Sequence, residues 1–291
     1  MKTHYMDQRN DSPQQRLTLL ELLLVWEGRI YRSRVCELFG IGLPRASQWI
    51  KEIRDLNPTW MQWDSKYRSY FATSDFYKRY AKASQADISE SLSRYLSMVG
   101  LPYASAMENG DSVAWSATPS ITAPKPKIFA SLGNAIRQGK SVEIEYMSMS
   151  EPAPHRRTIF PHSLVLAGHR WHVRAFSETH QEFRDYALGR IIEVKPLARL
   201  ADRARFDDPD WNTKVKVRLV AHPKLSPAQA RVIQAEYFNG TASRVETCRA
   251  ALVPYFIQGI HAAMDTQTQH PPEYLIAVEN AREVSKWLFN R

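Results

Sequence analysis

The 291-residue sequence has 44% hydrophobic residues and carries 39 Lys and Arg against 30 Asp and Glu, a formal net charge of +9. This length suits two or three domains that each bury a core, and the positive charge favours an anionic partner. Cys36 and Cys248 lie far apart, which argues against a disulfide framework or a zinc site. The polar first residues do not resemble a signal peptide, and no apolar run is long enough for a membrane span, so we expect a cytoplasmic protein with no membrane partner.

Three helices are expected near the start of the chain. RLTLLELLLVWEG predicts a buried helix that stops at Gly28, and SRVCELFG predicts a short helix with Ser33 as N-cap and Gly40 as its end. PRASQWIKEIRDLNP predicts a third helix with Pro44 in its first position, ending before Pro58. Two short helices joined by a tight turn with a glycine make a helix-turn-helix.

The third helix has an apolar face and a basic face. Ala46, Trp49, Ile50 and Ile53 are spaced to pack inward, and the next segment, WMQWDSKYRSYFAT, alternates as a hairpin wing. In helix-turn-helix proteins the second helix of the motif enters the major groove, although such shapes also occur in enzymes and partner-binding domains. We expect duplex DNA to be bound by polar and basic side chains of this helix and wing, namely Arg45, Ser47, Gln48, Lys51, Arg54, Lys66 and Arg68.

A central segment with several short strands follows a predicted linker over 104–126. IFASLGNAIRQGK predicts a helix that ends at Gly139, and four or five strands follow in about 60 residues, which is typical of a small barrel or bent sheet. RWHVRAF alternates in this segment: Trp171, Val173 and Ala175 share an apolar face, and the other face carries Arg170, His172 and Arg174.

The order IEY, RTIFPH, GHRWHVRA, FRDY and LGRI resembles the WYL domain, an Sm-like small β-barrel of bacterial transcriptional regulators. Trp171, His172 and Val173 stand where that family has its Trp-Tyr-Leu triplet. Nearly the whole chain is similar to the BrxR and CapW repressors of bacterial anti-phage defence operons, such as BREX and CBASS. The resemblance implies a homodimer that binds an inverted-repeat operator, represses its own operon, and is released when an effector reaches the WYL domain.

The polar residues of the central strands suggest what this effector is. If their faces converge, they form a concave site with few acids that suits an anionic nucleotide or oligonucleotide, because guanidinium groups bind phosphate and aromatic rings stack on bases. Arg184 could instead pair with neighbours of Asp185 or with Glu143 or Glu145, and His162 could be a structural histidine. The resemblance implies these ligand-binding candidates: Tyr146, Ser148, Arg157, His162, His172, Arg174, Arg184 and Arg190.

The last segment is expected to be an α+β dimerisation domain of nearly neutral charge. KVKVRLV predicts a strand, SPAQARVIQAEYF a helix with Ser226 as N-cap, and RVETCRAALVPYFIQGIH a further strand-rich stretch. Tyr255, Phe256 and Trp287 are expected to be exposed, which favours a protein contact. The alternative is a simple packing domain.

The sequence therefore predicts an α+β multidomain protein. Its parts are a winged helix-turn-helix with trailing helices over 1–103, the linker, a ligand-sensing WYL domain over 127–204, and the dimerisation domain over 205–291. We expect a repressor that binds operator DNA; the alternative is an activator switched on by single-stranded DNA or a nucleotide. An enzyme is disfavoured because the central acids are scattered and no catalytic motif is found, so no catalytic residue, metal or cofactor is expected.

Overall fold

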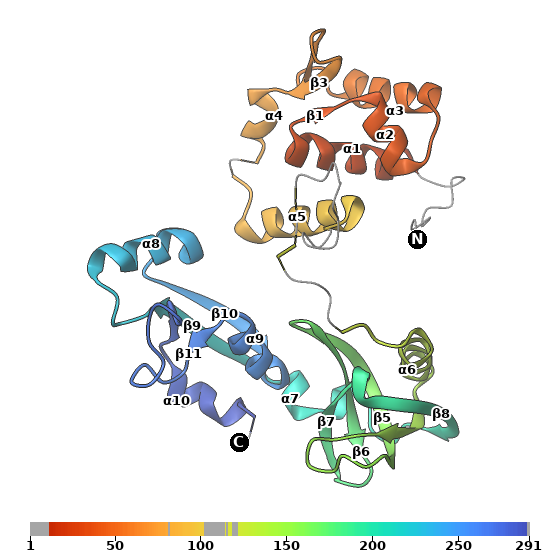
Figure 1. The fold of residues 1–291 in the computed structure, drawn as a ribbon, viewed down its shortest axis with the longest axis vertical. Helices are drawn as coiled ribbons and strands as arrows, with labels where there is room; N and C mark the ends of the chain where they lie inside the picture. Colours follow the sequence, from red (N-terminus) through yellow and green to blue (C-terminus); the bar gives the residue numbers. More distant parts are fainter. Residues whose placement is uncertain (1–11, 81, 102–113, 115, 118–121, 290–291) are drawn as a thin grey trace. The chain divides into compact units, whose positions relative to one another are not determined.

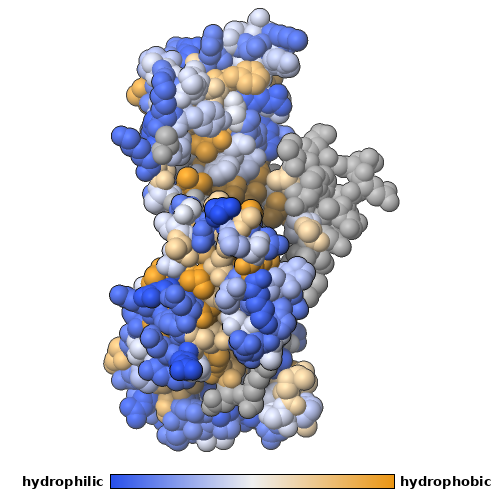
Figure 2. All heavy atoms as spheres, turned by 90° about the vertical axis from the view of Figure 1, so that its left-hand side faces the viewer, coloured by the Kyte–Doolittle hydropathy of each residue, from blue (hydrophilic) through white to orange (hydrophobic). Residues whose placement is uncertain are grey.

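The computed structural model describes residues 12–80, 82–101, 114, 116–117 and 122–289. The chain divides into two separately packed units, residues 1–119 and 120–291 (Figure 1). Most of the predicted linker, including residues 104–113, lies outside the described residues. On the face drawn in Figure 2, hydrophilic residues predominate and hydrophobic residues form patches among them. Among the described residues, no helix combines the length and apolar character needed to cross a bilayer.

The first unit is a winged helix-turn-helix. Its helices are α1 (Pro13–Glu27), α2 (Arg32–Phe39), α3 (Leu43–Leu56), α4 (Ser74–Lys78) and α5 (Gln85–Val99), and its strands are β1 (Arg29–Ile30), β2 (Met61–Asp64) and β3 (Ser69–Ala72). The strands form an antiparallel sheet in the order β1-β3-β2. The predicted three helices and hairpin are thereby confirmed.

Local sequence signals set most of the boundaries in this unit. Gly28 and Gly40 end α1 and α2 in the left-handed conformation, with φ of 69° and 63°. The prediction of Ser33 as the N-cap of α2 is wrong, because α2 begins at Arg32 with Tyr31 as N-cap. Pairing of β1 with β3 extends the backbone as far as Ile30, so the helix starts almost directly after the strand.

The second unit begins with helix α6 (Pro126–Gln138) and a five-stranded antiparallel sheet. The strands are β4 (Lys140–Tyr146), β5 (His155–Ala167), β6 (Arg170–Ser177), β7 (Glu182–Ala187) and β8 (Ile191–Leu200), in the order β7-β6-β5-β4-β8, with the 3-10 helix η2 (Leu188–Arg190) before β8. The long strand β5 shifts register between Pro161 and Ser163, where proline cannot donate a ladder hydrogen bond.

Helix α6 and this sheet share one hydrophobic core. Leu132 of α6 and Val173 and Ala175 of β6 are fully buried in it, and Trp171 packs edge-on against Phe129 with ring centroids 5.1 Å apart. The apolar face predicted for RWHVRAF is therefore confirmed as core.

The rest of the second unit is an α+β fold. Its helices and 3-10 turns are η3 (Arg205–Asp207), α7 (Pro209–Asn212), α8 (Pro227–Phe238), η4 (Ala250–Leu252), α9 (Val253–Gly259), α10 (Ala281–Val284) and η5 (Ser285–Trp287). Its strands are β9 (Lys214–Ala221), β10 (Ser243–Arg249), β11 (Ala262–Ala263) and β12 (Ile276–Val278), in the order β10-β9-β12-β11. Ser226 caps α8 as predicted.

Two expectations for this last segment are corrected. The stretch predicted to be rich in strands is a strand only as far as Arg249, and α9 then begins with Pro254 in its first turn, a position that favours a helix start. Tyr255, Phe256 and Trp287 are half-buried rather than exposed, because Phe256 and Trp287 pack against the domain core and Tyr255 packs on β6.

Candidate functional site

Helix α3 is held by its buried face, so its other side chains are positioned by a rigid element. Ala46, Trp49, Ile50 and Ile53 are each at most 4% exposed and pack against α1 and α2, as predicted. The N-cap Gly42 is extended and the first turn contains Pro44 but no acidic residue. The helix therefore begins with no side-chain cap and no negative side chain, which suits an anionic partner.

Arg45 and Gln48 form one group of the predicted DNA-binding residues. The Arg45 guanidinium lies 5.7 Å from the ring centroid of Trp49. The Gln48 amide donates a 3.1 Å hydrogen bond to Glu52, which also pairs with Arg16 at 3.4 Å. To contact a base, the Gln48 amide must give up its hydrogen bond to Glu52 and bond to the base edge instead.

Ser47, Lys51, Arg54 and Arg68 form a second group around a pocket of about 220 Å³ between α3 and the wing. Arg54 Nη1 donates to Tyr70 Oη of the wing at 3.2 Å, and its guanidinium also binds Asp55. Lys66 is separate from both groups, in the turn of the wing over the ring of Tyr67 at 5.4 Å. The structure thus divides the seven predicted residues among three places.

The same pocket is lined by residues that the sequence reasoning missed. They are Tyr31, Arg32, Ile50, Trp63 and Tyr70. The alternation of the wing strands could have indicated Trp63 and Tyr70. Tyr31 and Arg32 carry no such signal, because their place beside the wing depends on the pairing of β1 with β3.

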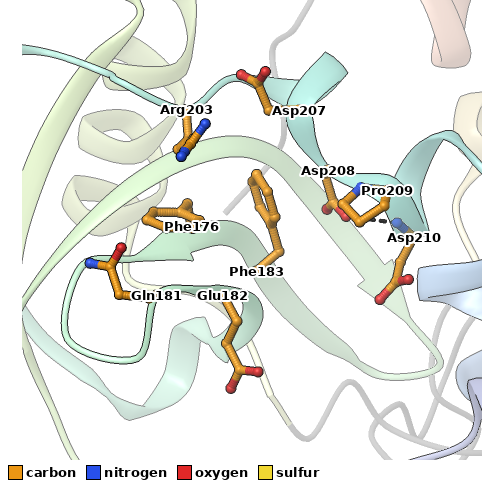
Figure 3. Close-up of a pocket in the computed structure, with 9 residues that line it drawn as sticks. All are labelled: Phe176, Gln181, Glu182, Phe183, Arg203, Asp207, Asp208, Pro209 and Asp210. Carbon is orange, nitrogen blue, oxygen red and sulfur yellow. Dashed lines mark hydrogen bonds between the residues drawn. The ribbon is translucent and has the colours of Figure 1, made fainter.

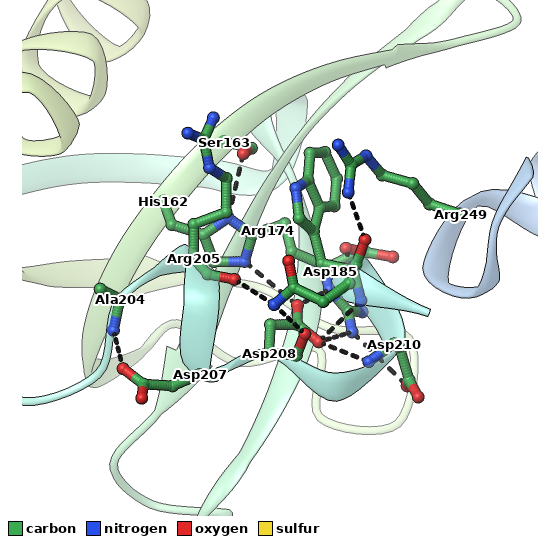
Figure 4. A network of polar contacts seen from close by, with 12 residues as sticks. His162, Ser163, Arg174, Asp185, Ala204, Arg205, Asp207, Asp208, Asp210 and Arg249 are labelled. Atoms are coloured by element: carbon green, nitrogen blue, oxygen red, sulfur yellow. Dashed lines mark hydrogen bonds and ion pairs between the residues drawn. The ribbon is translucent and has the colours of Figure 1, made fainter. Parts of the chain in front are cut away.

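In the second unit, a buried polar network joins the central sheet to the segment that follows it (Figure 4). Asp208 is fully buried and accepts hydrogen bonds from Arg174 Nε at 2.7 Å, Arg174 Nη2 at 3.1 Å and His162 Nε2 at 3.1 Å. It also accepts from the backbone amides of Asp210 and Trp211, as the N-cap of α7. Burial alone would raise the pKa of Asp208, but the hydrogen bonds from His162 and Arg174 outweigh it and hold the pKa well below its usual value.

The network extends to the C-terminal segment through Asp185 and Tyr255. Asp185 lies 3.5 Å from Arg174 Nη1 and accepts a 3.0 Å hydrogen bond from Tyr255 Oη of α9. Burial raises the pKa of Asp185 despite these partners, and burial beside that carboxylate raises the pKa of the Tyr255 hydroxyl. Charged and polar side chains of β5, β6, β7, α7 and α9 are therefore connected through Asp208 and Asp185.

This network shows that the polar face of β6, expected to be basic and open to a ligand, is largely buried and paired with acids. Arg174 and His172 are 5% and 6% exposed, so two of its three polar residues are buried and only Arg170 is exposed. The expected scarcity of acids is also wrong, because Asp208, Asp185 and Asp210 all lie within 3.6 Å of the Arg174 guanidinium. His162 is 7% exposed and hydrogen-bonded to Ser163 and Asp208. This agrees with the alternative prediction that His162 is a structural histidine.

A cavity of about 380 Å³ beside this network has the wrong charge for an anion (Figure 3). Its lining is Phe176, Gln181, Glu182, Phe183, Arg203, Asp207, Asp208, Pro209 and Asp210. Four carboxylates face a single guanidinium, and none of the eight predicted ligand-binding residues belongs to this lining.

Three of the other predicted ligand-binding residues lie near the start of β5 and on β7. Arg157 contacts His180 at 2.7 Å and Glu151 at 2.9 Å, and Ser148 Oγ accepts from the Glu151 amide. Arg184 pairs with Glu182 at 2.5 Å rather than with Glu143 or Glu145. Tyr146 is 5% exposed and packs edge-on against Tyr186 in the core.

His172 and Arg190 form a third place, together with Arg170. Burial lowers the pKa of His172 to about 4, and the positive charges of Arg170 and Arg190 add to this effect. Its Nδ1 atom is buried without a hydrogen-bond partner, and its ring packs on Tyr255 with centroids 5.1 Å apart. Among the described residues, neither Arg170 nor Arg190 has an ion-pair partner; the Asp185 carboxylate near this place is bonded to the Tyr255 hydroxyl and to Arg174.

Three family models match successive parts of the chain. They are the BrxR transcriptional regulator winged helix-turn-helix domain at residues 12–100, the WYL domain at 127–196, and the BrxR transcriptional regulator C-terminal dimerization domain at 214–284. A solved structure of proteasome accessory factor B/C (PafBC) of Arthrobacter aurescens aligns with 98% of this chain at 17% identity and a TM-score of 0.27. This chain covers 50% of that protein's length.

Curated relatives match over almost the full length. The DNA-binding transcriptional repressor CapW of Pseudomonas aeruginosa is 32% identical over 93% of this chain and 90% of its own. CapW of Escherichia coli gives the same values, and CapW of Stenotrophomonas maltophilia is 31% identical over 94% of this chain and 91% of its own. These relatives are named as regulators and not as enzymes. The chain therefore belongs to the BrxR and CapW family of transcriptional regulators, in which a winged helix-turn-helix, a WYL domain and a C-terminal domain follow one another.

Proposed function

We propose that this protein represses transcription as a homodimer bound to an inverted-repeat operator, and that an anionic nucleotide or oligonucleotide bound to its WYL domain releases it. The basic surface of α3 and the wing, in a chain whose relatives are named DNA-binding repressors, is the observation that carries the proposal. In this proposal the protein represses the operon that contains its own gene, and that operon encodes a phage-defence system.

Base reading is assigned to the recognition helix. Arg45 and Gln48 lie in the N-terminal half of α3, and a bidentate contact from such side chains to a base edge contributes about 1–3 kcal/mol of discrimination. Lys66 at the wing turn and the group around Ser47 and Lys51 contact the backbone, which fixes orientation without reading sequence.

The operator test uses the DNA upstream of the protein's own gene in a gel-shift assay. Arg45→Ala and Gln48→Ala should each reduce affinity by about tenfold, since about 1.4 kcal/mol corresponds to a factor of ten. Arg94→Ala, on the exposed side of α5, is the matched control and should bind like wild type. Unchanged affinity in both α3 variants would rule out this recognition surface.

Dimerisation is assigned to the C-terminal segment. Its family model is described as a dimerization domain, and α8 and β10 expose the apolar side chains Val232 (62%), Tyr237 (39%) and Val245 (49%). A two-fold dimer fits an inverted repeat, because each half-site then meets one recognition helix. Light scattering after size exclusion should give a dimer for wild type and a monomer for Val245→Glu; a wild-type monomer at all concentrations contradicts the proposal.

The effector is assigned to the basic place around His172. Arg170 and Arg190 offer guanidinium groups that no described carboxylate neutralises, and the ring of Tyr255 lies beside His172. Arg157 and Arg184 are paired with Glu151 and Glu182 and lie farther along the sheet, so in this proposal they do not belong to this place. Arg174 and His162 are engaged with Asp208, so in this proposal they position the sheet and do not touch the effector.

The effector test combines identification with binding. Nucleotides that co-purify with the protein are identified by mass spectrometry, and binding of short single-stranded DNA is measured by fluorescence anisotropy. Arg190→Ala should weaken this binding, whereas Arg137→Ala on the exposed side of α6 should not. Absence of any co-purifying nucleotide together with absence of oligonucleotide binding would contradict the effector proposal and leave operator binding unaffected.

A further inference from the structure

The pocket between α2, α3 and the wing is built almost entirely from cationic and aromatic side chains. Its cations are Arg32, Lys51, Arg54 and Arg68, and its aromatic residues are Tyr31, Trp63 and Tyr70, with Ser47 and Ile50 completing the lining. No carboxylate belongs to the lining. These residues come from three segments, the start of α2, helix α3 and the wing, whose elements lie in the first unit (Figure 1).

The positive charge of this pocket is largely uncompensated. Arg54 is paired with Asp55, but within the part of the chain that the structure describes Arg32, Lys51 and Arg68 have no ion-pair partner. Like charges brought to one pocket repel each other, and a bound anion relieves that repulsion. In the free protein the pocket therefore carries positive charge that a bound anion would neutralise.

Backbone geometry at the same place also favours an anion. Tyr31 is the N-cap of the eight-residue helix α2, and its side chain makes no cap hydrogen bond, so no side chain of the N-cap accepts from the first-turn amides. The first turn of α2 contains no acidic residue. The positive end of the helix dipole thus adds to the charge of Arg32, which is the first residue of the helix.

The aromatic walls give the pocket a defined shape. Trp63 and Tyr70 pack with ring centroids 4.9 Å apart, and the Tyr70 hydroxyl accepts from Arg54. Trp63 is 48% exposed, so part of its side chain is open to solvent. An exposed aromatic wall beside cations without ion-pair partners suits a phosphate whose deoxyribose can lay its C–H face on a ring.

From these observations we propose that the pocket binds one phosphodiester of duplex DNA, with Tyr31, Arg32, Trp63 and Tyr70 as DNA-binding residues beyond those of α3 and the wing tip. The inference rests on the proposed binding of DNA by this unit. Ser47 and Lys51 belong both to the pocket and to the recognition helix, so a phosphate held there fixes the register of α3 on the duplex. The contact is independent of sequence.

The test measures the salt dependence of binding to a mixed-sequence duplex of about 30 base pairs, by fluorescence anisotropy on the full chain between about 50 and about 200 mM KCl. Removing one phosphate contact should lower the slope of log affinity against log salt by about 0.9. We expect Arg32→Ala to lose this amount and to bind roughly tenfold more weakly at the lowest salt, and Arg32→Lys to restore most of the slope. Trp63→Ala should weaken binding with little change in slope.

Arg94→Ala is the control for loss of one exposed positive charge in the same unit, and circular dichroism melting checks that each variant is folded. An Arg32→Ala variant with wild-type slope and affinity overturns the proposal. If about 10 mM inorganic phosphate stabilises wild type but not Arg32→Ala while the duplex slopes agree, the pocket is a small-anion site and the proposal also fails. Loss of operator preference with a retained Arg32 effect would contradict the proposed repressor function but not this pocket.

Discussion

Replacing Asp208 by asparagine should destabilise the second unit strongly, because it leaves a buried guanidinium without its main counter-charge. The Arg174 side chain is 6% exposed, and Asp208 supplies its two shortest hydrogen bonds. Asparagine keeps the size of the side chain and one oxygen that can cap α7, so the change removes the charge and replaces the oxygen that accepts from Arg174 Nε and His162 by an NH2 group that cannot accept. The measured loss therefore reports the ion pair rather than a cavity or a broken helix end.

The expected loss is about 3 kcal/mol. Removing one partner of a buried ion pair typically costs about 3–5 kcal/mol, because the remaining charge stays desolvated. Asp185 and Asp210 remain at 3.5 and 3.6 Å from Arg174, which favours the lower end of that range. Because the pKa of Asp208 is lowered, its contribution is present above its ordinary pKa of 3.8 and is lost only as the pH falls well below that value.

Urea unfolding followed by tryptophan fluorescence and far-UV circular dichroism measures this loss. Asp202→Asn, which removes an exposed carboxylate paired with Arg199, is the control and should change stability by less than about 1 kcal/mol. A double replacement, Arg174→Met with Asp208→Leu, should be more stable than Asp208→Leu alone, since it removes the stranded charge. An Asp208→Asn variant as stable as Asp202→Asn would refute the reasoning.

Three further predictions concern other parts of the chain. The pKa of His172 is about 4 in the folded protein and 6.5 ordinarily, so the unfolded chain binds more protons below pH 6.5. The free energy of unfolding should therefore fall by up to about 3 kcal/mol between pH 6.5 and 4. Calorimetric scans of His172→Gln should show a smaller fall over the same pH range. Gly28→Ala should cost about 1 kcal/mol in thermal melts, because φ at this position is 69°, whereas a wild-type melting temperature would contradict the left-handed cap. Tyr255→Phe should cost about 1–3 kcal/mol by leaving Asp185 short of a donor, and no change in urea midpoint would argue against that bond.

The sequence alone determined the elements whose signals are local. Apolar residues three and four positions apart in α3, the glycines after α1 and α2, and the capping serine of α8 each act within one or two turns of chain. The winged helix-turn-helix and its basic surface were therefore predictable before the fold was known. The prediction of a strand-rich stretch failed over 250–259 because short apolar runs have no periodicity that separates a strand from a helix.

Only the tertiary structure decided what the two basic regions contain. Alternation in RWHVRAF separated its faces correctly, but it could not show that Asp208, 34 residues beyond Arg174, buries and neutralises that guanidinium. In the first unit, Arg32 meets Trp63 and Arg68 through the pairing of β1 with β3, and no local pattern encodes that meeting. The periodicity of the sequence around a residue indicates which face of the strand or helix its side chain lies on. The charges near that side chain depend on segments distant in the chain.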